Sequence, residues 1–349
     1  MTGRPPSRAT IFDVAARAGV SIGTVSNALN RPEAVRPETR ERILDAVRDL
    51  GFRPNSAAKA MATGQSASIG LVLPDLHNSL YVDIVRGAEE EISRFKHHLL
   101  IMNSDVSQEK QVANLGVLTS AGARAVMLSP HNGDLTGMAE TVRDGSHVVL
   151  VDFPADESLA CSVSVDERLG GYLAARHLIE QGYRRIAYVG PATTWYAVGA
   201  RWEGIERAAR ETAGVEIESV ETPTLTFPDG FDAGQALAHR PEGERPDAII
   251  AAIDLIAVGC VAGLLEGGGL RVPDDVAIIG FDDNYYAAQI GIPISTIAKP
   301  GFRMGTEAAR VIRREVDEGP EHRHEAVILA PELIVRSSSA PRATAEGAR

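Results

Sequence analysis

The sequence predicts a small all-α domain followed by a large α/β core of two lobes. The first 50 residues hold three amphipathic helical patterns, and from Ile69 onward short continuous apolar runs alternate with longer helical patterns. Continuous apolar strands that alternate with helices are typical of parallel sheets covered on both faces. Two successive sets of this alternation indicate two similar lobes, in a chain of 349 residues that has room for two or three domains.

The stretch from Thr10 to Asn30 predicts two short helices joined by a tight turn. Thr10 and Asp13 can form a capping box at the start of the first helix, and Gly19 can end that helix in the left-handed conformation. Ser21 can cap the second helix, whose inner face is apolar. Two helices joined by a turn that contains glycine form the helix-turn-helix unit, whose second helix enters the DNA major groove. An ordinary helical hairpin inside a larger core is the alternative interpretation.

Two further segments complete the first part of the chain. A third helix is predicted from Pro37, which suits the first helical position, to Leu50, which precedes Gly51. Residues 54–62 are alanine-rich and have a high helix propensity, but they are too few for a stable isolated helix in water. We therefore divide the chain into a headpiece (1–53), a hinge helix and linker (54–68), a core (69–336) and a disordered tail (337–349).

The core is expected to hold strands at its apolar runs and helices between them. The predicted strands cover residues 69–73, 98–102, 125–128, 147–152, 185–190, 248–252 and 276–280. The predicted helices cover residues 79–95, 108–120, 135–144, 169–181, 197–213 and 254–266. Ligands of open α/β sheets bind beyond the carboxyl ends of the strands, which here means the cleft between the two lobes.

Charge is divided unevenly along the chain. Residues 1–63 carry ten Lys and Arg against six Asp and Glu, a net charge of +4, whereas the whole chain carries −12. The remaining residues therefore carry −16. A basic first part on an acidic body is expected where only the first part approaches the phosphates of a nucleic acid.

Several classes of protein are excluded or disfavoured. No run of eighteen apolar residues and no signal-peptide pattern occurs, and two cysteines make no disulfide framework, so we expect a cytoplasmic protein with no membrane partner. No nucleophile elbow, phosphate-binding loop or zinc spacing is present, and we expect neither an enzyme nor a cofactor. Asp254, Asp282 and Asp283 lack the context of a glycosidase acid pair. The stretch from His322 to His324 is interpreted as a solvated charged turn and not as a metal site.

Short motifs in order along the chain resemble those of one known family. They are Asp13-Val14-Ala15, Ala18-Gly19-Val20-Ser21, Thr24-Val25-Ser26, Leu29-Asn30, Pro74-Asp75 with Asn78, Gly182-Tyr183-Arg184-Arg185-Ile186-Ala187, Val272-Pro273-Asp274-Asp275-Val276 and Gly280-Phe281-Asp282-Asp283. The sequence is similar to the lactose-repressor (LacI/GalR) family of bacterial transcription regulators. The resemblance implies a helix-turn-helix headpiece on a periplasmic-binding-protein-like core of two parallel-sheet lobes.

The resemblance also implies how DNA is contacted. The base-reading positions match Ile22, Gly23 and Asn27: an asparagine can bridge adenine N6 and N7, and an isoleucine can pack on a thymine methyl. Side chains placed to contact phosphates are Thr10, Ser21, Thr24, Ser26 and Asn30, although simple helix capping is the alternative role for the hydroxyls. In the hinge, the DNA-contacting positions are Asn55, Ala58 and Met61. Met61 stands where the family has a leucine that wedges into the minor groove, and it is apolar and adaptable enough for that role.

The family's effector contacts match a set of residues in the expected cleft. They are Leu80, Tyr81, Ser129, Asp152, Arg201, Phe227 and Asp282, to which we add Lys299. The region around Phe227 departs from the family pattern through a short insertion between Pro223 and Asp232. Ile253 replaces a usual asparagine and Lys299 a usual glutamine. Two cations, Arg201 and Lys299, suit an anionic sugar acid or sugar phosphate; the alternative is that an acid neutralises Lys299 and the ligand is a neutral sugar.

The sequence thus predicts a transcription regulator that responds to a small-molecule effector. We expect a repressor that binds a pseudo-palindromic double-stranded operator as a homodimer, with a hinge helix that orders on the DNA. A regulator of the same build that is controlled by a protein partner, or an activator, is the alternative. A solute-binding or enzymatic protein with a vestigial headpiece is a third class, which would bind no operator.

Overall fold

The computed structural model describes residues 9–52 and 68–339. These residues belong to two units, which we call the N-terminal unit and the core; the boundary lies between residues 66 and 67. Among the described residues, no helix is long and apolar enough to cross a lipid bilayer.

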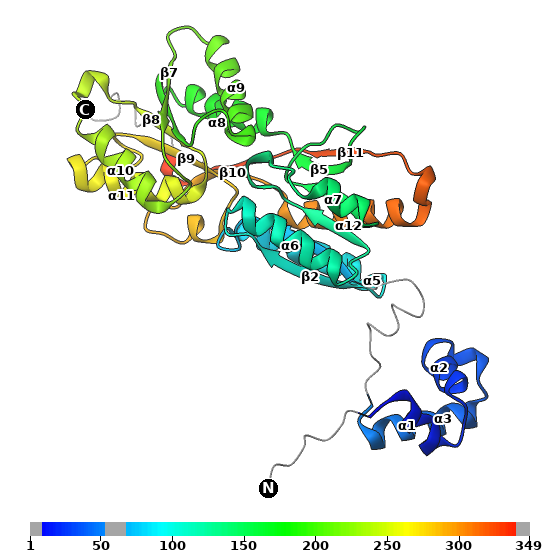
Figure 1. The fold of residues 1–349 in the computed structure, drawn as a ribbon. Coiled ribbons are helices and arrows are strands. Elements are labelled where there is room, and N and C mark those ends of the chain that lie inside the picture. Colours follow the sequence, from blue (N-terminus) through cyan, green and yellow to red (C-terminus); the bar gives the residue numbers. More distant parts are fainter. Residues whose placement is uncertain (1–8, 53–67, 340–349) are drawn as a thin grey trace. The chain divides into compact units, whose positions relative to one another are not determined.

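The described part of the N-terminal unit, residues 9–52, contains three helices and one short 3-10 turn (Figure 1): α1 (Ile11–Ala18), α2 (Ile22–Asn30), η1 (Pro32–Ala34) and α3 (Pro37–Leu50). The capping box of Thr10 and Asp13 is present, and Gly19 ends α1 with a φ of 68°. This positive φ explains why glycine stands at the turn. Val25 and Ile43 are fully buried in the apolar cluster that the three helices share. The predicted helix-turn-helix is therefore confirmed.

The core contains two six-stranded sheets, one in each lobe. Lobe 1 has the order β11-β5-β4-β3-β1-β2, and all its neighbouring strands are parallel. Its strands are β1 (Ser68–Leu73), β2 (His98–Asn103), β3 (Ala125–Leu128), β4 (His147–Val151), β5 (Cys161–Val165) and β11 (Ala326–Leu329). Lobe 2 has the order β12-β10-β9-β8-β6-β7, in which only β12 is antiparallel to its neighbour. Its strands are β6 (Arg185–Gly190), β7 (Glu216–Glu221), β8 (Ala248–Ala251), β9 (Ala277–Phe281), β10 (Ser295–Ala298) and β12 (Glu332–Ile334).

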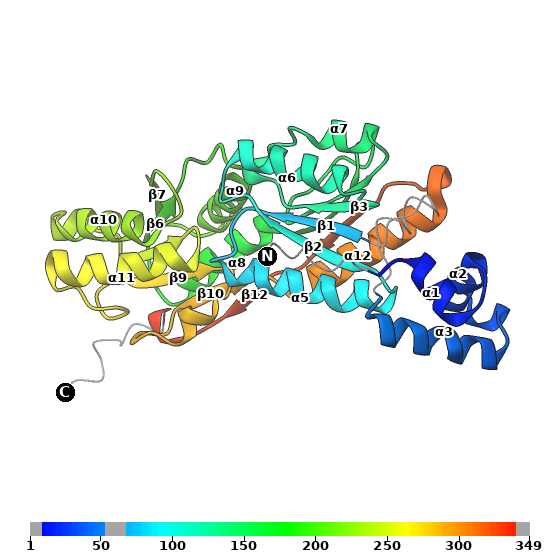
Figure 2. The ribbon, with the colours of Figure 1, turned by 60° about the horizontal axis from the view of Figure 1, so that its bottom comes forward.

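Helices cover both faces of each sheet. In lobe 1 they are α5 (Ser79–Arg94), α6 (Gln108–Ser120), α7 (Met138–Arg143) and α12 (Gly301–Glu318). In lobe 2 they are α8 (Glu167–Glu180), α9 (Tyr196–Arg210), α10 (Phe227–Ala238) and α11 (Asp254–Gly268). One apolar cluster joins the sheet of lobe 1 to α5 and α12, and another joins its other face to α6 and α7. In lobe 2, α8 and α9 cover one face, while α10 and α11 lie side by side on the other (Figure 2).

The chain crosses between the lobes three times. It leaves lobe 1 after β5, returns after β10 through Lys299 and Pro300 to α12, and leaves again after β11 through Ala330 and Pro331. The helix α12 therefore belongs to lobe 1, although it follows a strand of lobe 2. This connectivity puts residues of very different sequence position at the junction of the lobes.

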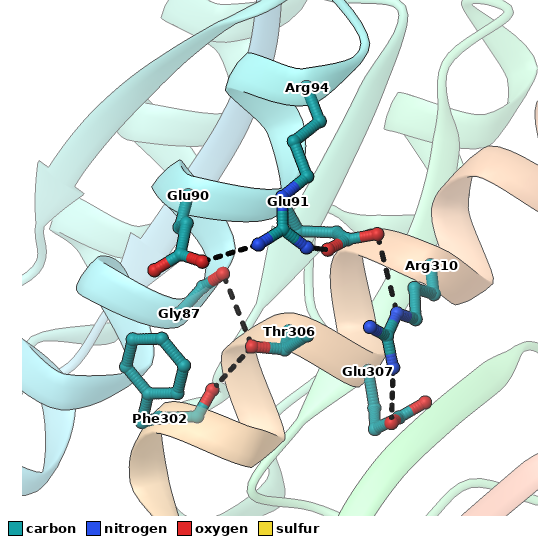
Figure 3. A network of polar contacts seen from close by, with 8 residues as sticks. All are labelled: Gly87, Glu90, Glu91, Arg94, Phe302, Thr306, Glu307 and Arg310. Carbon is teal, nitrogen blue, oxygen red and sulfur yellow. Dashed lines mark hydrogen bonds and ion pairs between the residues drawn. The ribbon is translucent and has the colours of Figure 1, made fainter.

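The helices α5 and α12 approach each other closely because each presents glycine to the backbone of the other at their crossing. A Cβ atom at Gly87 would lie 1.9 Å from the carbonyl oxygen of Phe302, so no larger residue fits there. Polar contacts continue the interface (Figure 3): Thr306 donates to the carbonyl of Gly87, and Glu91 accepts from both Arg94 and Arg310. These contacts fix the returning helix α12 to lobe 1.

The structure corrects two expectations about the chain's organisation. Strands β5, β7, β10, β11 and β12 and helices α10 and α12 were not among the predicted elements. The expected disordered tail from residue 337 is wrong at its start, since Ser337–Ser339 forms a 3-10 turn. Ser338 and Ser339 are fully buried, and their hydroxyls bond Ile278 O at 2.6 Å and Ser295 Oγ at 2.7 Å. The core thus extends to residue 339, and residues 340–349 lie outside the described residues.

Candidate DNA-binding surface and effector site

The outer face of α2 carries the predicted base-reading positions. Ile22 is 40% exposed, and Gly23 and Asn27 are also exposed. Ser21 caps the helix by accepting from the backbone N–H of Thr24 at 3.1 Å. The apolar face of α2 lies on the buried side. An isoleucine, a glycine and an asparagine side by side on an exposed helix are free to approach base edges in a major groove.

Two of the predicted phosphate contacts, Thr10 and Ser21, cap helices in this unit. Thr10 and Asp13 bond each other at 2.7 Å, and the hydroxyls of Ser21 and Thr24 lie 2.8 Å apart. Ser26 is partly buried on α2, and Asn30 is the last residue of that helix. The hinge positions Asn55, Ala58 and Met61 lie outside the described residues.

In the core, two aspartates occupy matching positions at the carboxyl ends of central strands. Asp152 follows β4 in lobe 1 and Asp282 follows β9 in lobe 2, and both have a left-handed backbone, with φ of 60° and 93°. In each case the aspartate N–H still bonds the neighbouring strand, at Val163 O (2.8 Å) or Ile297 O (2.9 Å). A non-glycine residue at positive φ is strained, and such strain is concentrated at functional sites.

A buried network of four charged side chains includes the first of these aspartates, Asp152. Lys299 Nζ lies 2.5 Å from Asp152 Oδ1 and 2.9 Å from Glu167 Oε1. Arg201 Nε donates to the other oxygen of Glu167 at 2.7 Å. All four side chains are at most 9% exposed. Each cation in this network is therefore paired with a carboxylate.

The network perturbs the pKa values of its carboxyls in opposite directions. Burial disfavours ionisation of Glu167, but the adjacent Arg201 and Lys299 outweigh it and lower its pKa to about 2. Burial raises the pKa of Asp152 to about 6; Lys299 opposes this rise and the negative Glu167 adds to it. Glu167 therefore stays ionised and is the counter-charge of the two cations. Asp152 becomes protonated at a higher pH than Glu167 does.

Some of the remaining polar atoms at the junction lack hydrogen-bond partners. Asp282 Oδ2 accepts from Asn78 Nδ2 at 2.7 Å, but its buried Oδ1 accepts no hydrogen bond. The buried hydroxyl of Tyr188 lies beside Arg201 but makes no hydrogen bond of good geometry. Tyr81 lies close to Asp152, Asp282 and Lys299, and burial raises its pKa. Buried polar groups without partners are rare in native proteins and mark places where a ligand or water supplies the bond.

Direct contacts hold the lobes together at this junction. Ser79 of lobe 1 donates its N–H and its hydroxyl to Asn284 Oδ1 of lobe 2, at 2.7 and 2.8 Å. Phe153 and Tyr196 form an edge-to-face ring pair with centroids 5.1 Å apart, and His131 and Trp195 form another at 5.5 Å. A ligand that enters between the lobes must therefore replace these contacts with its own contacts to residues of both lobes.

Comparison with known proteins identifies the family. The family description "Bacterial regulatory proteins, lacI family" matches residues 10–55, and "Periplasmic binding protein-like domain" matches residues 175–339. The HTH-type transcriptional regulator RegA of Clostridium saccharobutylicum is 32% identical over 347 residues, which cover 95% of this chain and 99% of RegA. The chain belongs to the LacI family. It is a DNA-binding transcriptional regulator, as the family and its relatives are named.

Solved structures of LacI-family regulators share the fold. The structure of the transcriptional regulator CelR with cellobiose has a TM-score of 0.69 and 28% identity, and the match covers 95% of this chain and all of that one. The lac repressor dimer bound to operator and the anti-inducer ONPF has a TM-score of 0.82 at 21% identity, over 95% of this chain and 99% of that one. The predicted fold class is therefore confirmed.

The structure groups six of the eight predicted effector residues at the lobe junction of this LacI-family chain. They are Tyr81, Ser129, Asp152, Arg201, Asp282 and Lys299. The other two have different surroundings. Leu80 is 3% exposed in the hydrophobic core of lobe 1, and Phe227 begins α10, is 38% exposed and stacks on Phe231.

Sequence reasoning missed Glu167, Asn78, Tyr188 and Asn284 as members of the site. Asn78 carries a local signal, because it caps α5 by accepting from the N–H of Leu80. Glu167 carries none, since its two cationic partners lie 34 and 132 residues away in the chain.

A cavity of about 400 Å³ lies elsewhere in lobe 1, among residues such as Arg94, Arg124 and Arg313, and the predicted effector residues do not line it.

The interpretation of His322 as a solvated residue is wrong. Its side chain is 5% exposed, and its Nε2 lies 3.1 Å from the thiol sulfur of Cys161. Pairing of β11 with β5 brings the residues before β11 beside the first residue of β5, which buries the histidine.

Proposed function

We propose that this chain is a repressor that binds a pseudo-palindromic operator as a homodimer and whose operator affinity changes when a neutral sugar binds between its lobes. The exposed face of α2, with Ile22, Gly23 and Asn27, supports sequence reading in the major groove. We place the hinge positions Asn55 and Met61 at the minor groove by the resemblance stated above. Homodimers match pseudo-palindromic operators because both have two-fold symmetry.

We propose a neutral sugar because both cations at the junction are already paired with carboxylates. Arg201 and Lys299 share Glu167, and Lys299 also contacts Asp152. An anionic ligand would have to displace a carboxylate to reach either cation, so the cation pair expected from the sequence gives no reason for an acidic sugar. Asp282 Oδ1 and the Tyr188 hydroxyl accept no protein hydrogen bond and suit the hydroxyl groups of a sugar. The related CelR was solved with cellobiose, a neutral sugar.

Titration of sugars against the full-length protein tests this proposal. Neutral mono- and disaccharides are compared with their acid and phosphate forms, using the fluorescence of Trp195, which lies in the ring pair at the junction. We expect a neutral sugar to bind and Asp282→Asn to weaken its binding at least tenfold. Tight binding of an acid or phosphate form alone, lost in Lys299→Gln, would show that the ligand is anionic. Operator release that needs a second protein and no sugar would show control by a protein partner.

A further inference from the structure

Four potential metal-binding side chains converge at the end of lobe 1 away from the effector site. They are Cys161, Glu315, His322 and His324, and each offers one ligand atom within 4.8 Å of the other three. Cys161 Sγ lies 3.1 Å from His322 Nε2 and 3.5 Å from His324 Nδ1. Ligand atoms of a tetrahedral zinc site lie about 3.5 Å apart. The four side chains therefore need only a small contraction to surround one ion.

We propose that these four residues form a structural zinc site. One thiolate, two imidazoles and one carboxylate make a closed set of four ligands, of the atom types that Zn²⁺ prefers. Binding of Zn²⁺ forms the metal–sulfur bond as the Cys161 thiol releases its proton to solvent. With four protein ligands the ion has no open position, so the site stabilises the fold and does no chemistry.

The surroundings of the cluster have the features of a metal site. Glu315 is buried, and its Oε2 has no hydrogen-bond partner, which leaves one carboxylate oxygen available to an ion. His147 Nδ1 contacts the other oxygen, Oε1, at 3.1 Å and so holds the carboxylate in place. His322 Nδ1 lies 2.8 Å from Glu318 Oε2, on the opposite side of the ring from Cys161. Metal-binding histidines commonly donate their second nitrogen to a carboxylate in this way, which fixes the tautomer and the ring orientation.

The fold brings these ligands from three separate elements to one place. Cys161 begins β5, Glu315 lies in the last part of α12, and both histidines lie in the segment that leads into β11. The bond from Ser162 N to Glu325 O (3.0 Å) aligns that segment with the start of β5. An ion here would tie α12 and the edge strand β11 to the sheet at its amino end, the end at which β1 begins with Ser68. Because the ligands are spread over the chain, no local zinc spacing appears in the sequence.

Cobalt substitution tests the site directly. Full-length protein, freed of any affinity tag and of metal, is titrated with Co²⁺ under reducing conditions, and a thiolate-to-cobalt charge-transfer band is recorded. We expect one equivalent of Co²⁺ to produce the band and Zn²⁺ to remove it. The band should disappear in Cys161→Ser and persist in Cys260→Ser. Cys260 is the matched control, because it is equally buried but lies in the core of lobe 2.

The variant His324→Gln and the effect of zinc on the Tm test the site even if Cys161→Ser does not fold. His324 is only partly buried, so His324→Gln should fold even if Cys161→Ser does not, and we expect it to weaken Co²⁺ binding at least tenfold. Zinc in hundredfold excess over its dissociation constant should raise the Tm of the unmodified protein by about 5 °C and that of His324→Gln much less. A band that survives Cys161→Ser, or cobalt binding without any thiolate band, overturns the proposal. Unchanged affinity in His324→Gln overturns it as well.

Discussion

Replacing Glu167 by glutamine should destabilise the core strongly, because two buried cations share this carboxylate. Its oxygens accept from Arg201 at 2.7 Å and from Lys299 at 2.9 Å. A glutamine of the same shape retains one carbonyl oxygen but directs its amide N–H groups at one of the cations. The Glu167→Gln variant therefore buries a positive charge that has lost its counter-charge.

The expected magnitude follows from the cost of breaking a buried ion pair. Arg201 and Lys299 hold the pKa of Glu167 below its ordinary value, so the ionised carboxylate stabilises the folded state. Removing one partner of a buried ion pair typically costs about 3–5 kcal/mol. In a domain of this size, 1 kcal/mol moves the Tm by about 2–4 °C. We therefore expect Glu167→Gln to lower the Tm by about 10 °C at pH 7.

Thermal unfolding followed by circular dichroism measures this effect, with Glu203→Gln as the matched control. Glu203 is also a glutamate paired with an arginine, Arg168, but these side chains are 55% and 58% exposed. An exposed pair contributes about 0–1 kcal/mol, so the control should melt close to the unmodified protein. If Glu167→Gln melts within about 2 °C of Glu203→Gln, Glu167 is not the counter-charge that the network requires.

Three further outcomes are expected. Asn27→Ala should cost about 1–3 kcal/mol of affinity for the operator and little for random DNA, measured by fluorescence anisotropy; an equal loss on both would show that Asn27 does not read bases. Met61→Ala should weaken operator binding and leave sugar binding unchanged, and unaltered operator affinity would remove Met61 from the DNA contacts. The lowered pKa of Glu167 stabilises the folded state above pH 4.5, and this stabilisation is lost as the pH falls toward 2. The raised pKa of Asp152 acts in the opposite direction, because it makes stability fall as the pH rises through about 6. Denaturation midpoints between pH 2 and 7 should therefore show a decline below pH 4.5 that is smaller in Glu167→Gln than in the unmodified protein.

The fold was predictable from sequence where strands are continuously apolar. β1, β3, β4, β6, β8 and β9 all coincide with predicted apolar runs to within one residue at each end. β5 was missed although it is fully buried, because Ser162 and Ser164 interrupt its apolar pattern. β7 was missed because it is an edge strand, with the alternating polar residues that one solvated side allows. α12 did carry a signal, since Met304, Ala308 and Val311 recur at helical spacing.

The site was predictable only in part, because sequence shows residue types and not their partners. The resemblance found Asp152, Arg201 and Lys299, but it could not show that Glu167 is paired with both cations. The two cations therefore favoured an anionic ligand until the ion pairs were visible. His322 was misread as solvated for the same reason, since its neighbour Cys161 lies 161 residues earlier in the chain.

The most direct test of the account is the operator affinity of the full-length protein with and without its sugar. The operator is first recovered by sequencing the genomic fragments that the purified protein binds, and a sugar that changes the tryptophan fluorescence is then added to the protein–operator complex. Coupling between two sites typically amounts to 5–150-fold, so we expect the sugar to change the operator Kd by at least about fivefold. The Asp282→Asn variant should bind the operator equally well without sugar and need at least about tenfold more sugar for the same change. A sugar that binds at the lobe junction and leaves the operator Kd unchanged would contradict the account.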